Sequence, residues 1–263
     1  MTRRSKIPAI LNWVVLIFFY APILLLVFTS FNGSKIVGNW GGFSLRWYEQ
    51  LFCSREARNI WAALRNTLLV ASIATVVSTI LGTTSAIALH KYKGRIQNAN
   101  YLLVYTPLVV PEILIGISML LFFVNVHVQL GITTVIIAHI TFCISYVTMA
   151  VLARLQDFDS TILEAAQDLG ANNWQTTWKV FLPVIFPGVL SGALLAFTLS
   201  VDDYVISSFV AGPGSTTLPI HVYSMIRRGS LPMINALSTL LLAITFLIIL
   251  AVQILGRKKK QAA

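Results

Sequence analysis

Residues 163–187 read LEAAQDLGANNWQTTWKVFLPVIFP and lie between two long apolar stretches. The segment opens with helix-favouring residues, and Gly170 permits the left-handed turn that ends a helix. A second helical stretch follows and is expected to stop at Pro183, because proline lacks the backbone N–H that a helix interior needs. The segment is too polar to cross a membrane and too regular to be a slack loop. It is therefore predicted to form a short pair of helices between two membrane spans.

The composition of the whole chain is that of a membrane protein. Of its 263 residues, 57% are hydrophobic and only 11% are charged, and the mean hydropathy is +0.80. A soluble globular domain carries about 25% charged residues, so this chain has too few to cover a surface that faces water. The composition excludes a soluble enzyme, a disordered chain and a disulfide scaffold.

Six apolar windows are long enough to cross a bilayer. A helix that crosses about 30 Å of hydrocarbon needs about 20 apolar residues. The windows are about 10–31, 62–89, 101–124, 132–152, 186–210 and 235–255. They predict an all-α polytopic membrane protein with six transmembrane helices in a single domain, residues 1–263. The polar segment falls in a connection of about 153–185, between the fourth and fifth windows.

Basic residues flank the apolar windows and account for the net charge of +10. This distribution indicates topology and not nucleic-acid binding, because cytoplasmic flanks of membrane proteins are rich in Lys and Arg. With both termini in the cytoplasm, twelve of the 19 Lys and Arg residues are cytoplasmic. The other seven are Lys35, Arg46, Arg55, Arg58, Arg65, Arg227 and Arg228. We therefore expect cytoplasmic termini, a cytoplasmic connection at 153–185, and outer segments at about 32–61 and 211–234.

Three acidic residues, Glu112, Asp202 and Asp203, fall inside predicted spans. A carboxylate at the bilayer centre costs about 2.5–3.5 kcal/mol on insertion scales, and no span offers an obvious Lys or Arg partner at matching depth. The acids are therefore expected to line a wet interior where, with the Tyr204 ring, they attract a cation such as an amine. The alternative is structural: Asp202 or Asp203 caps a helix broken at this point or pairs with a partner subunit. In the same way, Glu112, directly after Pro111, can begin a half-helix.

The polar segment also carries a spaced motif. It consists of Glu164, Ala165 and Ala166, then Gly170 after three residues, Val180 after nine more, and finally Leu182 and Pro183. The motif resembles the Glu-Ala-Ala loop of the membrane permeases of bacterial ABC importers, with Val180 where that family has isoleucine. The resemblance implies the fold of a type I ABC importer permease. It also implies that this loop is a coupling helix that seats in a groove of an ATPase subunit. The residues assigned to ATPase coupling are Glu164, Ala165, Ala166, Gly170, Leu182 and Pro183.

Beyond this motif the resemblance covers nearly the whole chain and is to the spermidine/putrescine permeases of the PotC type. It rests on FNGS at 31–34, RWY at 46–48, HITFC at 139–143, LEAAQDLG at 163–170 and FTLSVDDYVISSFVAG at 197–212. It implies a non-catalytic permease subunit of an ATP-driven polyamine importer in the bacterial inner membrane. The implied partners are a homologous second permease, two copies of an ABC ATPase, a periplasmic polyamine-binding protein and membrane lipid.

No cofactor is expected on this chain, which has no phosphate-binding glycine-lysine loop, so ATP and Mg are assigned to the partner ATPase. No metal site is expected, because the four histidines show no ligand spacing. The predicted substrate pathway consists of Asp202, Asp203, Glu112 and Tyr204. The sequence does not choose between the two aspartates or between putrescine and spermidine. Two alternatives stay open: an importer of another small solute, and a stand-alone cation channel or proton-coupled carrier.

Overall fold

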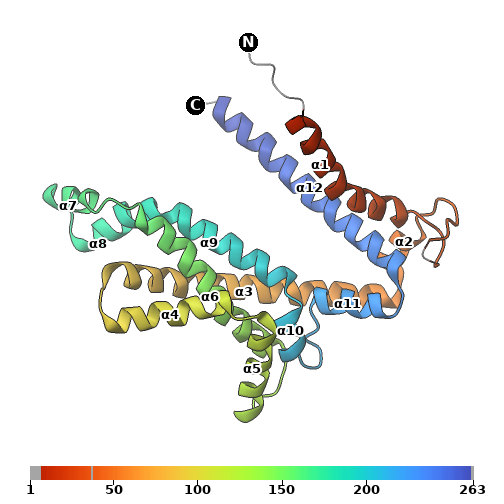
Figure 1. Ribbon diagram of the computed structural model, residues 1–263, viewed down its shortest axis with the longest axis horizontal. Coiled ribbons are helices and arrows are strands. Elements are labelled where there is room, and N and C mark those ends of the chain that lie inside the picture. Colours follow the sequence, from red (N-terminus) through yellow and green to blue (C-terminus); the bar gives the residue numbers. More distant parts are fainter. Residues whose placement is uncertain (1–6, 37, 262–263) are drawn as a thin grey trace. The chain divides into compact units, whose positions relative to one another are not determined.

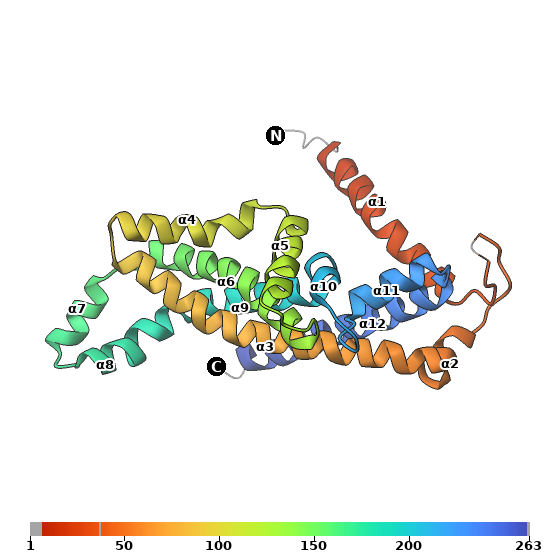
Figure 2. The same ribbon diagram turned by 90° about the horizontal axis from the view of Figure 1, so that it is seen from below.

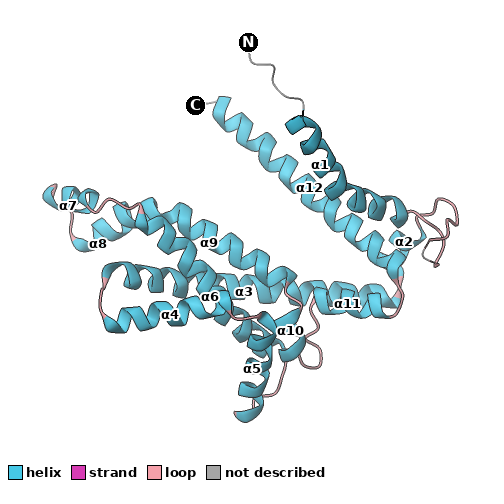
Figure 3. Ribbon diagram, in the orientation of Figure 1, coloured by secondary structure: helices cyan, strands magenta, loops and turns pink. Residues whose placement is uncertain are grey.

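The computed structural model describes residues 7–36 and 38–261, and these residues form helices and loops (Figure 3). Within these ranges, a single β-bridge joins Asn32 and Phe43. The predicted all-α class is confirmed. The helices are α1 (Ile7–Ser30), α2 (Arg46–Cys53), α3 (Arg55–Lys91), α4 (Arg95–Val109), α5 (Glu112–Asn125), α6 (Ile132–Gln156), α7 (Thr161–Asp168), α8 (Asn173–Gln175), the π-helix η1 (Thr176–Phe181), α9 (Leu182–Asp202), α10 (Val205–Val210), α11 (Leu218–Arg227) and α12 (Leu231–Gln261). The chain divides into two compact units, Met1–Trp61 with Val222–Ala263, and Ala62–His221.

In the unit Ala62–His221, α6 is the central helix and contacts α4, α5, α9 and α10 (Figure 1). Helix α3 also packs against it, because Gly82 lies directly over Val147 of α6. Gly192 of α9 also lies close to this valine, since a Cβ added at residue 192 would be 3.2 Å from the Val147 Cα. Small residues at such positions let helix backbones approach closely, which is how helices gain packing energy inside a membrane. At Val147, both α3 and α9 therefore come close to α6.

The predicted window 101–124 is broken into α4 and α5. The two helices meet at 111° across a short break, and α5 runs across the direction of α4 (Figures 1 and 2). The cause is Pro111, which precedes α5 and has no N–H with which to continue α4. Val110 before it is extended, the conformation that a following proline favours. The predicted window 101–124 therefore contains two helices, which form one broken span or a re-entrant loop.

Four helical stretches of the described residues are long and apolar enough to cross a membrane, and the α4–α5 pair adds a fifth if it forms one span. The four are Leu11–Ser30, Arg55–Lys91, Ile132–Gln156 and Asn173–Asp202. The window predicted at 186–210 ends as a helix at Asp202 and resumes as the short α10. The window at 235–255 lies in α12, where Leu231–Leu247 forms a shorter apolar helix. Six spans therefore stay a prediction.

The connection predicted at 153–185 is shorter in the structure. Helix α6 continues to Gln156, and a continuous helical stretch runs from Asn173 to Asp202. The expected stop at Pro183 was wrong, because proline is tolerated in the first turn of a helix, and Pro183 lies in the first turn of α9. The π-helix η1 directly precedes α9, so the backbone hydrogen bonds already depart from the regular α-helical pattern just before Pro183.

In the other unit, α1 packs against α12, and α12 packs against α2. Asn235 of α12 donates to Thr29 Oγ1 of α1 at 3.0 Å. The loop after α1 is tied down by Trp47, whose Nε1 donates to the Asn32 carbonyl at 2.6 Å. Most of the apolar side chains of α1 are exposed, as expected of a helix whose surroundings are lipid.

Candidate functional site

Asp203 lies in the break between α9 and α10, and its carboxylate caps α10. Its backbone is extended. The Ile206 N–H donates to Oδ1 at 3.2 Å, and the Ser207 N–H donates to Oδ2 at 2.7 Å. A side chain in this position satisfies N–H groups that the first turn of a helix leaves without partners. The structural alternative considered for this acid, a cap at a broken helix, is thus present in the structure.

Asp203 also has a partner in a different helix. Nε2 of His139, in α6, lies 3.2 Å from Asp203 Oδ2 and 2.9 Å from Ser207 Oγ. The other ring nitrogen, Nδ1, lies 2.7 Å from Ser200 Oγ in the last turn of α9. His139 is fully buried and Asp203 is only 9% exposed. The Asp203 carboxylate is therefore buried against a histidine of another helix, and a role for Asp203 in the substrate pathway stays a prediction.

The other three predicted pathway residues are more accessible. Asp202 and Glu112 are exposed, and Tyr204 is partly exposed. Glu112 is the first residue of α5, directly after Pro111, as the half-helix alternative proposed. Helices α5 and α10 pack against each other, so the helix that begins with Glu112 lies against the helix that follows Tyr204. The two adjacent carboxylates differ in environment: that of Asp203 is buried and hydrogen-bonded, whereas that of Asp202 is exposed.

The motif residues Glu164, Ala165 and Ala166 lie on α7, a helix of two turns. Its start is capped by Asp159, whose Oδ1 accepts from the Thr161 N–H at 2.9 Å. This hydrogen bond lowers the pKa of the Asp159 carboxyl. Gly170 ends the turn with φ +89°, which confirms the predicted left-handed conformation.

The next helix begins with a reciprocal cap. The Gln175 N–H donates to Asn172 Oδ1 at 2.8 Å, and the Asn172 N–H donates to Gln175 Oε1 at 3.1 Å. Such a pair satisfies two N–H groups at a helix start and fixes the direction of the chain there. The short connection between α7 and α8 is therefore held at both ends, by Gly170 and by this cap.

Helix α7 has an inner and an outer face. Leu163 and Ala166 are partly buried, whereas Glu164 and Ala165 are exposed. The two alanines of the motif therefore face different surroundings. Of the later motif residues, Leu182 packs on the apolar core while Pro183 is exposed. The coupling residues predicted from the motif thus divide into those that hold the element in place and those that a partner can touch.

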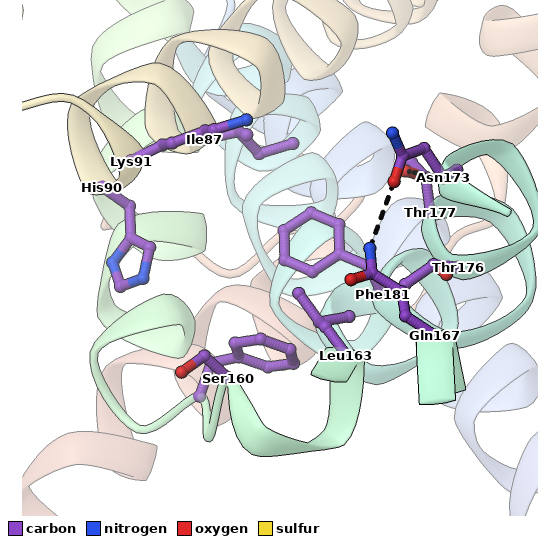
Figure 4. Close-up of a pocket in the computed structure, with 11 residues that line it drawn as sticks. Ile87, His90, Lys91, Ser160, Leu163, Gln167, Asn173, Thr176, Thr177 and Phe181 are labelled. Carbon is purple, nitrogen blue, oxygen red and sulfur yellow. Dashed lines mark hydrogen bonds between the residues drawn. The ribbon is translucent and has the colours of Figure 1, made fainter. Parts of the chain in front are cut away.

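The inner face of α7 borders a cleft of about 650 Å³ (Figure 4). The cleft lies between the end of α3, α7 and the start of the helical stretch that leads into α9. Its lining is Ile87, His90, Lys91, Phe158, Ser160, Leu163, Gln167, Asn173, Thr176, Thr177 and Phe181. A hydrogen bond from Gln167 Nε2 to Asn173 Oδ1, 3.1 Å long, closes one side of the cleft.

Residues 78–261 match the model of a protein family described as "Binding-protein-dependent transport system inner membrane component". The chain belongs to this family of transport permeases. It is a membrane component of a transporter, in agreement with the resemblance found in the sequence. Within this permease, the matched range contains the broken α4–α5 pair, the α7 element and the Asp203 network.

Curated relatives match over most of the length of the permease. It is 42% identical to the putrescine transport system permease protein PotI of Escherichia coli (strain K12), over 93% of this chain and 89% of that protein. It is 39% identical to the spermidine/putrescine transport system permease protein PotC of Haemophilus influenzae, over 94% and 95% of the two chains. The corresponding PotC of Escherichia coli (strain K12) is 37% identical, over 92% and 90%.

Solved structures share the fold at lower identity. A chain of a bacterial ABC transporter involved in the import of the acidic polysaccharide alginate matches with a TM-score of 0.72 at 17% identity, over 96% of this permease and 98% of that chain. A chain of the MetNI methionine ABC transporter matches with a TM-score of 0.57 at 22% identity, over 76% and 94% of the two chains. The fold is that of a type I ABC importer permease, as the motif predicted.

Proposed function

We propose that this permease is a subunit of an ATP-driven importer for polyamines, with spermidine and putrescine as its cargo. The proposal is carried by the 42% identity, over 93% of the chain, to a permease named for putrescine transport. Two relatives named for both spermidine and putrescine support the same substrate class.

The chemistry of the exposed residues supports a cationic cargo. A polyamine is a flexible polycation, and Asp202 and Glu112 are exposed carboxylates that fall within apolar windows of the sequence. Tyr204, next to Asp202, offers an aromatic face to an ammonium group. Passage requires release as well as binding, so each of these contacts must be weak.

Energy would come from a partner ATPase that binds ATP and Mg. We place its docking surface on the exposed side of α7, with Glu164 and Ala165 at the contact. Both termini and this element then lie in the cytoplasm, and residues 32–61 and 211–234 face the binding protein outside. ATP-driven movement of the ATPase pair would push the α7 element and, through α9, the break at Asp203. A homologous second permease would complete the pathway, and each permease would seat one copy of the ATPase.

The test is uptake by the complete importer in proteoliposomes, with radiolabelled putrescine and spermidine, binding protein outside and ATP inside. Uptake that requires both ATP and the ATPase supports the proposal. Uptake without the ATPase would establish a channel or a proton-coupled carrier instead. Failure to transport either amine, together with ATP-dependent transport of another solute that the binding protein captures, would assign the permease to a different importer.

A further inference from the structure

We infer that His139 is a positioning residue that holds the break between α9 and α10, and that it gives Asp202 and Asp203 different tasks. Asp203 holds the break from within the unit, and of the two aspartates only Asp202 is presented to the cargo. The part that concerns cargo rests on the proposed function, whereas the part that concerns the break does not.

The geometry of the imidazole supports the positioning role. His139 comes from α6, the central helix, and its two ring nitrogens contact both sides of the break. Nδ1 lies 2.7 Å from Ser200 Oγ, before the break, and Nε2 lies 2.9 Å from Ser207 Oγ, after it. A ring protonated at Nε2 shares its one N–H between Asp203 Oδ2 and Ser207 Oγ and accepts a hydrogen bond from the Ser200 hydroxyl at Nδ1, so both ring nitrogens have a partner. One side chain of α6 thereby fixes the ends of two helices.

The burial of Asp203 argues against direct contact with cargo. Its carboxylate already receives two backbone N–H bonds and lies 3.2 Å from Nε2 of His139. Only 9% of the residue is exposed. An amine could bind there only by displacing these partners, and a buried carboxylate that loses its donors is costly. Asp203 therefore stabilises the interior of the unit and does not bind cargo.

The position of Asp202 follows from the same break. It is the last residue of α9, one residue and about 100° of helical rotation from the line that Asp203 would continue. Its carboxylate is exposed. If His139 no longer held Ser200 and Asp203, the end of α9 would lose its fixed orientation, and Asp202 would be presented less accurately. His139 thus acts on the cargo through Asp202.

Four single variants and one double variant test this inference in the reconstituted importer. For each, KM and maximal rate of polyamine uptake are measured together with the Tm of the purified complex. Asp202→Asn should raise KM about fivefold to tenfold, since it removes a charged contact, and leave Tm unchanged. Asp203→Asn keeps a capping side chain, so it should lower Tm while KM changes by less than about twofold.

His139→Ala should lower Tm and raise KM, and the KM of the double variant with Asp202→Asn should be no higher than that of Asp202→Asn alone. His139→Gln places an amide nitrogen near the position of Nε2 and should restore KM and part of Tm. A side chain with a merely structural role would lower Tm without this dependence of KM on Asp202. If His139→Ala prevents assembly, which is the extreme form of the Tm loss, the comparison of Asp202→Asn with Asp203→Asn decides.

Two results would overturn the inference. One is a rise in KM for Asp203→Asn equal to that for Asp202→Asn, at unchanged Tm, which would make Asp203 a cargo contact. The other is a multiplication of the KM effects in the double variant, which would show that His139 does not act through Asp202. Absence of polyamine uptake by the unaltered importer would refute the proposed function separately, and the Tm values measured without cargo still test the role of His139.

Discussion

Gly82 of α3 lies against Val147 of α6 so closely that a Cβ at residue 82 would come within 2.7 Å of the valine Cβ. Real Cβ atoms do not approach this closely, so any larger residue must separate the two helices. Since buried packing is dense and resists such displacement, this contact sets how near α3 can come to the centre of its unit.

Gly82→Ala should therefore destabilise the permease by about 1–3 kcal/mol, the usual cost of overpacking. A thermal unfolding series in detergent measures the effect. Thr84→Ala is the matched control, because Thr84 is exposed and its hydroxyl bonds only to carbonyls of its own helix. Equal Tm values for the two variants would contradict the packing argument.

Gly170→Val should weaken coupling to the ATPase. A β-branched residue at φ +89° is strained by about 1–3 kcal/mol, so the turn after α7 would shift and move Glu164. The measurement is ATPase activity stimulated by the loaded binding protein. Gly131→Ala is the glycine control, because its backbone is extended and nothing lies within 4 Å of an added Cβ. Unchanged stimulation in Gly170→Val would count against the docking role.

The two faces of α7 should respond differently to alanine. Glu164→Ala removes an exposed side chain, so it should reduce copurification of the ATPase and leave the Tm of the isolated permease unchanged. Leu163→Ala removes part of the apolar lining of the cleft and should lower that Tm. Pull-down and unfolding experiments on both variants test the assignment, which is wrong if Glu164→Ala lowers Tm and spares copurification.

The cap at Asp159 should depend on pH. Its pKa is lowered by the Thr161 N–H, so its stabilising effect is complete above the pKa of the unfolded chain and is lost as pH falls through the folded value. Asp159→Ala should therefore speed amide hydrogen exchange at Thr161 at neutral pH. After correction for intrinsic exchange rates, the difference from the unaltered permease should shrink in strong acid. A difference that persists there would mean that the carboxylate is not the cause.

Local signals predicted much of this structure. The apolar windows predicted the helices, and Gly170 predicted the turn because its effect is confined to its own residue. Pro111 predicted the break before α5 for the same reason. The helix end predicted at Pro183 was wrong. The effect of this proline depends on the π-helix that precedes α9, and no sequence signal indicates a π-helix in that segment.

The pairing of His139 with Asp203 could not be predicted from such local signals. The two residues are in different helices, and no spacing rule links them. A usable signal was nevertheless present: an imidazole inside an apolar window is itself costly and needs a polar partner. Matching buried histidines with buried acids in other spans would have placed the pair among the candidates.

The segment that contains α7 and α8 exposes large apolar side chains. Leu169 is 90% exposed, and Trp174 and Trp178, whose rings contact each other, are exposed as well. Uncovered apolar groups of this kind promote aggregation and attract chaperones and proteases. With the proposed cytoplasmic orientation, a copy of the chain that fails to assemble leaves these side chains uncovered in the cytosol, where quality control can remove it before an unregulated pore accumulates in the membrane.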